Sequence, residues 1–225
     1  VVVTDGAGSP RSGIYKEFSD EQMKSVRIRE QNNAAALGDY SAQLQLAYKS
    51  ADVKKACCTQ LTDELAKIIR LCAPKNVFTH NLADKHDTHV SVALRVIEAL
   101  RKLSPKERPQ RVYSMEVWRS LDWLCDEDKV CFDTSQHPNL ANALLGVYDS
   151  QIAGGKRYDS AAIGRRLANA TFFASHDTDE YESLSYGLDI TDLIYDENTS
   201  PQEFIASYIK KFENEVSERI KKLSI

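Results

Sequence analysis

Residues Asn76–Leu100, NVFTHNLADKHDTHVSVALRVIEAL, decide the fold predicted for this chain. They begin with a short apolar strand, continue in a polar loop, and end in an amphipathic helix whose apolar residues recur at helical spacing. The loop holds three of the chain's five histidines, namely His80, His86 and His89. In an open α/β sheet, ligands bind at the edge where strands end and helices begin. We therefore predict a ligand site at this loop.

The residue types in the loop suit a metal site or a proton-transfer site. His86 and His89 are three residues apart, so in a first helical turn their side chains share one face. The positive end of the helix opposes an imidazolium, and the neutral imidazole is the form that binds a metal. Asp84 and Asp87 are candidates to orient these imidazoles. For Asp87, capping of the helix is an equally open role.

Strand and helix patterns alternate through the first half of the chain. Strands are predicted at residues 1–4 and 43–48, and helices from Ser19 to Leu37 and around residues 61–72. Such alternation is typical of parallel strands joined by right-handed helical crossovers. We therefore predict an α/β fold with a mostly parallel sheet and helices on both faces.

The second half continues the same fold without a clear boundary. Strands are predicted at residues 111–118 and 129–133. Helices are predicted at residues 139–152, 160–173 and 201–223. At 225 residues the chain is long enough for one full core, so we predict a single domain over residues 1–225, in which 190–225 form a C-terminal helical extension.

Composition disfavours several classes of partner. The formal charge of −4 comes with lysine and arginine spread along the chain, which argues against nucleic acid. No apolar run approaches the roughly 20 residues that span a bilayer. Five cysteines without Cys-x-x-Cys spacing are typical of reduced thiols, so we expect a cytoplasmic protein. The absence of Gly-x-Gly-x-x-Gly counts against a dinucleotide site.

Three local features have ordinary structural interpretations. Arg27 and Glu30 are spaced as an i, i+3 pair, which is most simply a solvated salt bridge on the first helix. Gly38 is placed to end that helix in a left-handed cap. Gly154-Gly155-Lys156-Arg157 lacks the P-loop pattern, so a helix-breaking turn is favoured over an anion site.

Five segments together resemble the PIG-L/LmbE-like deacetylase family. They are Val1–Gly6, Arg27-x-x-Glu30, Ala34–Gly38, Thr79–Val90 and Ser150-Gln151. The resemblance implies a Rossmann-like α/β fold and zinc-dependent removal of acetyl groups from N-acetylglucosamine in sugar conjugates. It therefore implies Zn²⁺ as cofactor and a small N-acetylated sugar as substrate, whereas it implies nothing about oligomeric state.

The resemblance also implies roles for single residues. The family motif His-Pro-Asp-His matches His86-Asp87-Thr88-His89, which makes His89 a zinc ligand and His86 the acid at the reacting carbonyl. The proline of the motif is missing and the aspartate stands one place early, so the role of Asp87 stays open. Arg27 matches an arginine that contacts the substrate in some members.

A departure from the family pattern concerns the first motif, His-x-Asp-Asp, which supplies two zinc ligands and the general base. This motif does not occur in the 225 residues. We therefore expect an N-terminally truncated deacetylase that lacks two metal ligands and the base, and is a poor catalyst in isolation. The alternative is a non-catalytic carbohydrate-binding module on the same fold.

Overall fold

The computed structural model describes residues 1–224, and its residues group into two compact units. The first unit consists of Val1–Val53 and Asp133–Ser185, and the second consists of Lys54–Phe132 and the chain from Tyr186 onward. Each unit therefore combines two segments that are far apart in the sequence, and each is described by itself below.

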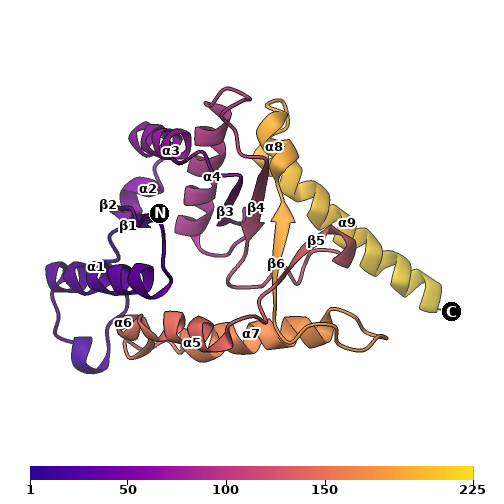
Figure 1. Ribbon diagram of the computed structural model, residues 1–225. Helices are drawn as coiled ribbons and strands as arrows, with labels where there is room; N and C mark the ends of the chain where they lie inside the picture. Colours follow the sequence, from indigo (N-terminus) through magenta and orange to yellow (C-terminus); the bar gives the residue numbers. More distant parts are fainter. Residues whose placement is uncertain (225) are drawn as a thin grey trace. The chain divides into compact units, whose positions relative to one another are not determined.

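The first unit is mainly helical. Its elements are β1 (Val2–Thr4), α1 (Asp20–Leu37), β2 (Gln45–Tyr48), α2 (Ser50–Val53), α5 (Pro138–Gly146), α6 (Asp149–Ile152) and α7 (Tyr158–Phe172), with a 3-10 turn at Gly13–Tyr15. β1 and β2 pair in parallel and form a separate two-stranded sheet (Figure 1). Both strands confirm the sequence prediction.

Helix α1 begins and ends where the sequence predicts, but its end has a different conformation. The Ser19 hydroxyl accepts a bond from the Gln22 N–H, and the Gln22 side chain accepts one from the Ser19 N–H, as in a capping box. The prediction of a left-handed Gly38 is wrong, because its φ is −85° and the left-handed residue is Asp39. An added Cβ at position 38 would contact the Tyr40 ring, which is exposed, and would lie 3.1 Å from the Ala34 carbonyl oxygen.

The single helix predicted over residues 139–152 is also wrong, since the chain turns at Val147–Tyr148 between α5 and α6. A continuous helix would direct the Ser150 N–H to the carbonyl of Gly146. Here that N–H donates instead to the Glu30 carboxylate of α1, at 2.7 Å. A tertiary contact thus replaces a helical bond and fixes the start of α6.

A second contact to α6 gives a testable pH dependence. The buried Tyr15 hydroxyl donates to Asp149 at 2.6 Å. Burial, followed by this bond and the Asp149 charge, raises the pKa of Tyr15 to about 12 from its ordinary value of 10.0. The folded state therefore keeps the phenol neutral, so its contribution to stability is complete below pH 10 and is lost as the pH rises through about 12.

We expect Tyr15→Phe to lower the free energy of unfolding by about 1–3 kcal/mol near neutral pH, as for a hydrogen bond to a charged acceptor. Urea unfolding of both proteins at neutral pH and above pH 10 would measure this. The difference between them should shrink at the alkaline pH. The exposed Tyr181 provides the control Tyr181→Phe, and a Tyr15→Phe deficit that grows with pH would contradict the linkage.

Most of a four-stranded sheet in the order β3-β4-β6-β5 belongs to the second unit. Its strands are β3 (Asn76–His80), β4 (Arg111–Met115), β5 (Lys129–Asp133) and β6 (Leu184–Asp189). β3 and β4 are parallel, whereas β4 and β6 are antiparallel. The α/β class is confirmed, but the prediction of a mostly parallel sheet is wrong. The sheet is mixed because β6 pairs with β4 in the antiparallel direction. Sequence analysis did not predict β6.

Helices α3 (Thr59–Cys72) and α4 (Asp87–Arg101) pack against each other, and α4 packs on β3 (Figure 1). The two helices bury apolar side chains at helical spacing. In α3 these are Leu61, Leu65 and Ile69, and in α4 they are Ala93, Ile97 and Leu100. This packing holds the N-terminus of α4 at the end of β3, which is where the histidine loop lies.

The unit ends with α8 (Thr191–Tyr195) and the long helix α9 (Pro201–Leu223). α9 confirms the predicted bounds, and its start is a capping box between Ser200 and Glu203 with proline in the first turn. Lys211 of α9 bonds Asp128 and pairs with Glu127. Within residues 1–224 no helix is long and apolar enough to cross a membrane.

Candidate functional site

The histidine loop is built on a buried asparagine. Asn81 follows β3 and is fully buried, and its backbone N–H extends the β3–β4 pairing to the Met115 carbonyl. Its side-chain amide donates to the Ser114 hydroxyl at 2.9 Å and accepts from the Ala83 N–H at 2.8 Å. Sequence analysis assigns Asn81 no role, because a polar residue in a polar loop gives no sign of burial. The structure shows it as the anchor of the loop.

Asp84 connects this anchor to two of the histidines. One carboxylate oxygen accepts the His86 N–H at 2.8 Å, and the other lies 3.1 Å from Nδ1 of His89. The Asp84 side chain has no exposed area. A carboxylate only accepts, so a neutral His89 holds its proton on Nδ1 and keeps the lone pair on Nε2. This is the arrangement in which a carboxylate orients a metal-binding imidazole.

The three imidazoles of the loop are stacked. The rings of His80 and His89 are parallel within 3°, with centroids 4.0 Å apart, and His86 lies on His89 at 4.7 Å. Burial, and then the neighbouring His89, lowers the pKa of His80 to about 4. His80 is therefore neutral at physiological pH. The structure thus brings His80, Asp84, His86 and His89 together, as expected for residues of one site.

Asp87 occupies neither of the positions predicted for it. His86 holds the N-cap position of α4, and Asp87 is the exposed first residue of the helix. Among residues 1–224, no hydrogen bond joins the Asp87 carboxylate to an imidazole. Its carboxylate still lies at the positive end of the helix, where a negative charge is favourable.

The histidine loop provides part of a zinc site but not a complete set of ligands. Nε2 of His89 is prepared as a ligand, and the neutral His80 lies beside it. Within the described residues, three donor atoms converge only at Cys125, Glu127 and Asp128, and not at this loop. Lys211 already pairs with both of those carboxylates, and burial raises the pKa of the Cys125 thiol to about 11. A complete zinc site would therefore need ligands in addition to those of the loop.

Arg27 and Glu30 lie in the first unit, and the predicted solvated salt bridge is wrong because Glu30 is buried and the Arg27 side chain is only slightly exposed. Their exposed fractions are 12% and 6%, and Nη1 of Arg27 is 3.8 Å from the Glu30 carboxylate. Glu30 instead forms short bonds to Ser150, accepting from its N–H and its hydroxyl at 2.7 Å each. The burial of Glu30 depends on its contact with Ser150, which lies 120 residues later in the chain. The i, i+3 spacing of Arg27 and Glu30 gives no sign of this contact.

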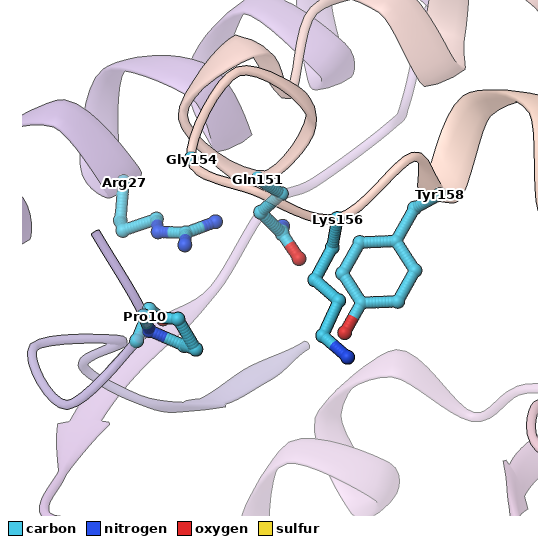
Figure 2. Close-up of a pocket in the computed structure, with 7 residues that line it drawn as sticks. Pro10, Arg27, Gln151, Gly154, Lys156 and Tyr158 are labelled. Carbon is cyan, nitrogen blue, oxygen red and sulfur yellow. The ribbon is translucent and has the colours of Figure 1, made fainter. Parts of the chain in front are cut away.

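Arg27 also lies in a pocket. The loop after β1 packs on its side-chain stem, and Gly6 has a φ of 69° and would bring a Cβ within 3.0 Å of the Arg27 Cγ. The guanidinium lines a small pocket of about 60 Å³ with Pro10, Gln151, Gly154, Lys156 and Tyr158 (Figure 2). The two family-like segments at residues 1–6 and 27–30 are therefore in contact. Burial lowers the pKa of Arg27 from its ordinary value.

The comparisons with known proteins agree with these features. A family model described as PIG-L, GlcNAc-PI de-N-acetylase, matches residues 1–100. The match covers 100 of the 225 residues, so the similarity to the PIG-L family is established for this part of the chain. The resemblance is thereby confirmed for the strand at the start, the Arg27–Glu30 segment and the histidine loop. The Ser150-Gln151 segment lies beyond the matched region.

Solved structures show the same fold over most of the chain. The conserved protein TT1542 from Thermus thermophilus is 16% identical, with a TM-score of 0.61 over 83% of this chain and 78% of that one. The N,N'-diacetylchitobiose deacetylase from Pyrococcus horikoshii, in complex with its inhibitor MPG, is 15% identical. Its TM-score is 0.59 over 86% of this chain and 72% of that one. At such identities the likeness establishes the fold alone.

Proposed function

We propose that this chain is a zinc-dependent de-N-acetylase that removes the acetyl group from an N-acetylated amino sugar or sugar conjugate. The observation that carries the proposal is the buried Asp84 carboxylate at Nδ1 of His89, which leaves Nε2 directed away as a ligand atom. The match to a de-N-acetylase family over residues 1–100 supports the reaction class. The name of the similar Pyrococcus horikoshii deacetylase supports a sugar substrate.

The proposed roles combine the family resemblance with the geometry of the loop. His89 would hold zinc, which when bound activates water and polarises the amide carbonyl. His86 is exposed at the N-cap of α4, where its imidazole would donate a proton to the leaving amine nitrogen. Asp84 fixes the tautomer and orientation of His89. Arg27 is proposed as a substrate-binding residue of the first unit.

The test is release of a free amine and acetate from N-acetylglucosamine conjugates by the full-length protein supplied with Zn²⁺. We expect His86→Ala to lower kcat by about 10²–10⁴-fold, as for loss of a general acid, while zinc binding persists. His137→Ala is the matched control, because it removes the imidazole at the N-cap of α5, which is not part of the histidine loop, and it should leave the rate unchanged. Sugar binding without any amine release would instead support the carbohydrate-binding module.

A further inference from the structure

His80 and His89 form a face-to-face pair at the histidine loop. His80 is the last residue of β3, and His89 lies in the first turn of α4. Their ring planes are inclined by 3°, and the ring centroids are 4.0 Å apart. Both residues belong to the second unit, so the contact lies within one compact unit. Of the two imidazoles that stack on His89, His80 is the nearer one, and the proposed reaction gives it no role.

The stacked geometry excludes His80 as a second ligand of an ion held by Nε2 of His89. The lone pair of an imidazole nitrogen lies in the plane of its ring. Because the two ring planes are nearly parallel, their lone pairs run side by side and do not converge. A zinc–nitrogen bond is about 2.0–2.1 Å long, and one ion cannot form it with both stacked rings. His80 therefore contacts His89 through its ring face.

The contact with Asp84 leaves one motion of the His89 ring open. The Asp84 carboxylate lies 3.1 Å from Nδ1 and restrains that edge of the ring. The torsion about the bond between Cβ and the ring is broad in histidine, so the ring plane can still rock about this edge. Rocking displaces Nε2 on the far side of the ring. A parallel ring on the face of His89 opposes the rocking, because tilting the plane loses the stacking contact.

We propose that His80 is a positioning residue of the metal site, whose ring fixes the plane of the His89 imidazole without binding the ion. Asp84 then restrains the edge of the ligand ring, and His80 restrains its plane. The inference rests on the proposed function for the identity of the ion, whereas the stack is a feature of the fold. Because only the ring face of His80 is used, another aromatic ring should replace it.

The first test is the zinc affinity of His80 variants, measured by competition with a chromophoric chelator. We expect His80→Ala to weaken the affinity by about tenfold, as for loss of a residue that orients a metal ligand. His80→Phe keeps a ring and removes both nitrogens, so it should retain the affinity within about threefold. The matched control is Phe78→Ala, which removes a ring of the same strand that contacts Tyr113 and Phe132. It should leave the affinity unchanged.

The second test follows the ring nitrogens directly, by nitrogen NMR of histidine-labelled protein. Added zinc should shift the Nε2 resonance of His89, because this atom binds the ion. Both ring nitrogens of His80 should keep the resonances of an imidazole that binds no metal. The spectrum of His80→Phe identifies the His80 signals by their loss. This readout requires no activity, and a purely structural role of His80 would not predict it.

Two results would overturn the positioning role. Equal losses of affinity in His80→Ala and His80→Phe, or a zinc-shifted nitrogen of His80, would mean that its nitrogens are needed and that the stack opens to bind the ion. Unchanged affinity in His80→Ala would mean that the stack does not restrain His89. Comparable thermal unfolding would show that the variants remain folded. Zinc held through His89 without any amine release would contradict the proposed function and keep the role of His80.

Discussion

Replacement of Glu30 by alanine is expected to lower the free energy of unfolding by about 3–5 kcal/mol, the cost of removing one partner from a buried ionic network. The carboxylate is 6% exposed and accepts both the N–H and the hydroxyl of Ser150. Without it, these donors and the Arg27 guanidinium remain buried without an acceptor. Urea unfolding at neutral pH, followed by circular dichroism, would measure the loss.

The same helix offers a matched control for Glu30. Glu21 of α1 pairs with Lys24 at 2.8 Å, but its side chain is 82% exposed. Glu21→Ala should therefore change the stability by less than about 1 kcal/mol. Glu30→Gln should fall between the two variants, because an amide keeps one acceptor and presents a donor to the Ser150 N–H. Equal effects of Glu21→Ala and Glu30→Ala would contradict the buried network.

The elements that sequence analysis predicts best are those with local signals. α9 begins at a proline preceded by Ser200 with Glu203 three residues later, and α1 has the same type of cap. These bonds form within one turn of helix, so the residues that decide them are adjacent in the sequence. Their positions therefore do not depend on how the rest of the chain folds.

The elements that sequence analysis misses depend on distant contacts. β6 contains Gly187, which weakens a strand pattern. In the sheet, a Cβ at this position would lie 2.9 Å from the Phe132 ring and 3.0 Å from the Met115 sulfur. The glycine is thus required by side chains of two other strands. Similarly, the turn between α5 and α6 depends on Glu30, which lies 120 residues before Ser150.

The candidate site shows the same division. Three histidines within ten residues, at a strand-to-helix junction, are enough to predict that the side chains of His80, His86 and His89 lie close together. The sequence does not predict which aspartate contacts the imidazoles, because Asp84 and Asp87 have the same side chain. They differ only in the direction in which the backbone points that side chain. The same limit applies to Arg27, whose spacing to Glu30 predicts the pair but not its burial.

Zinc binding by residues 1–225 is expected to be weak, with less than one ion retained per chain after dialysis near neutral pH. The loop prepares the Nε2 atom of His89, but three donor atoms do not converge there within the described residues. A single strong ligand cannot hold zinc against water and buffer, because affinity depends on several deprotonated ligands acting together. Competition with a chromophoric chelator would measure the affinity.

Variants of the loop make this expectation specific. His89→Ala should lower the remaining zinc affinity by about 100-fold or more, and Asp84→Asn by about 10–100-fold, since the carboxylate orients the ligand without binding the metal. His176→Ala is the matched control, because it removes an exposed imidazole that is not part of the histidine loop. Tight binding of one zinc that is lost with His89→Ala would mean that the remaining ligands lie within residues 1–225, and the expectation of weak binding would be wrong. Zinc binding that is unchanged by His89→Ala would remove His89 from the metal site, and with it the structural basis for a zinc-dependent reaction at this loop.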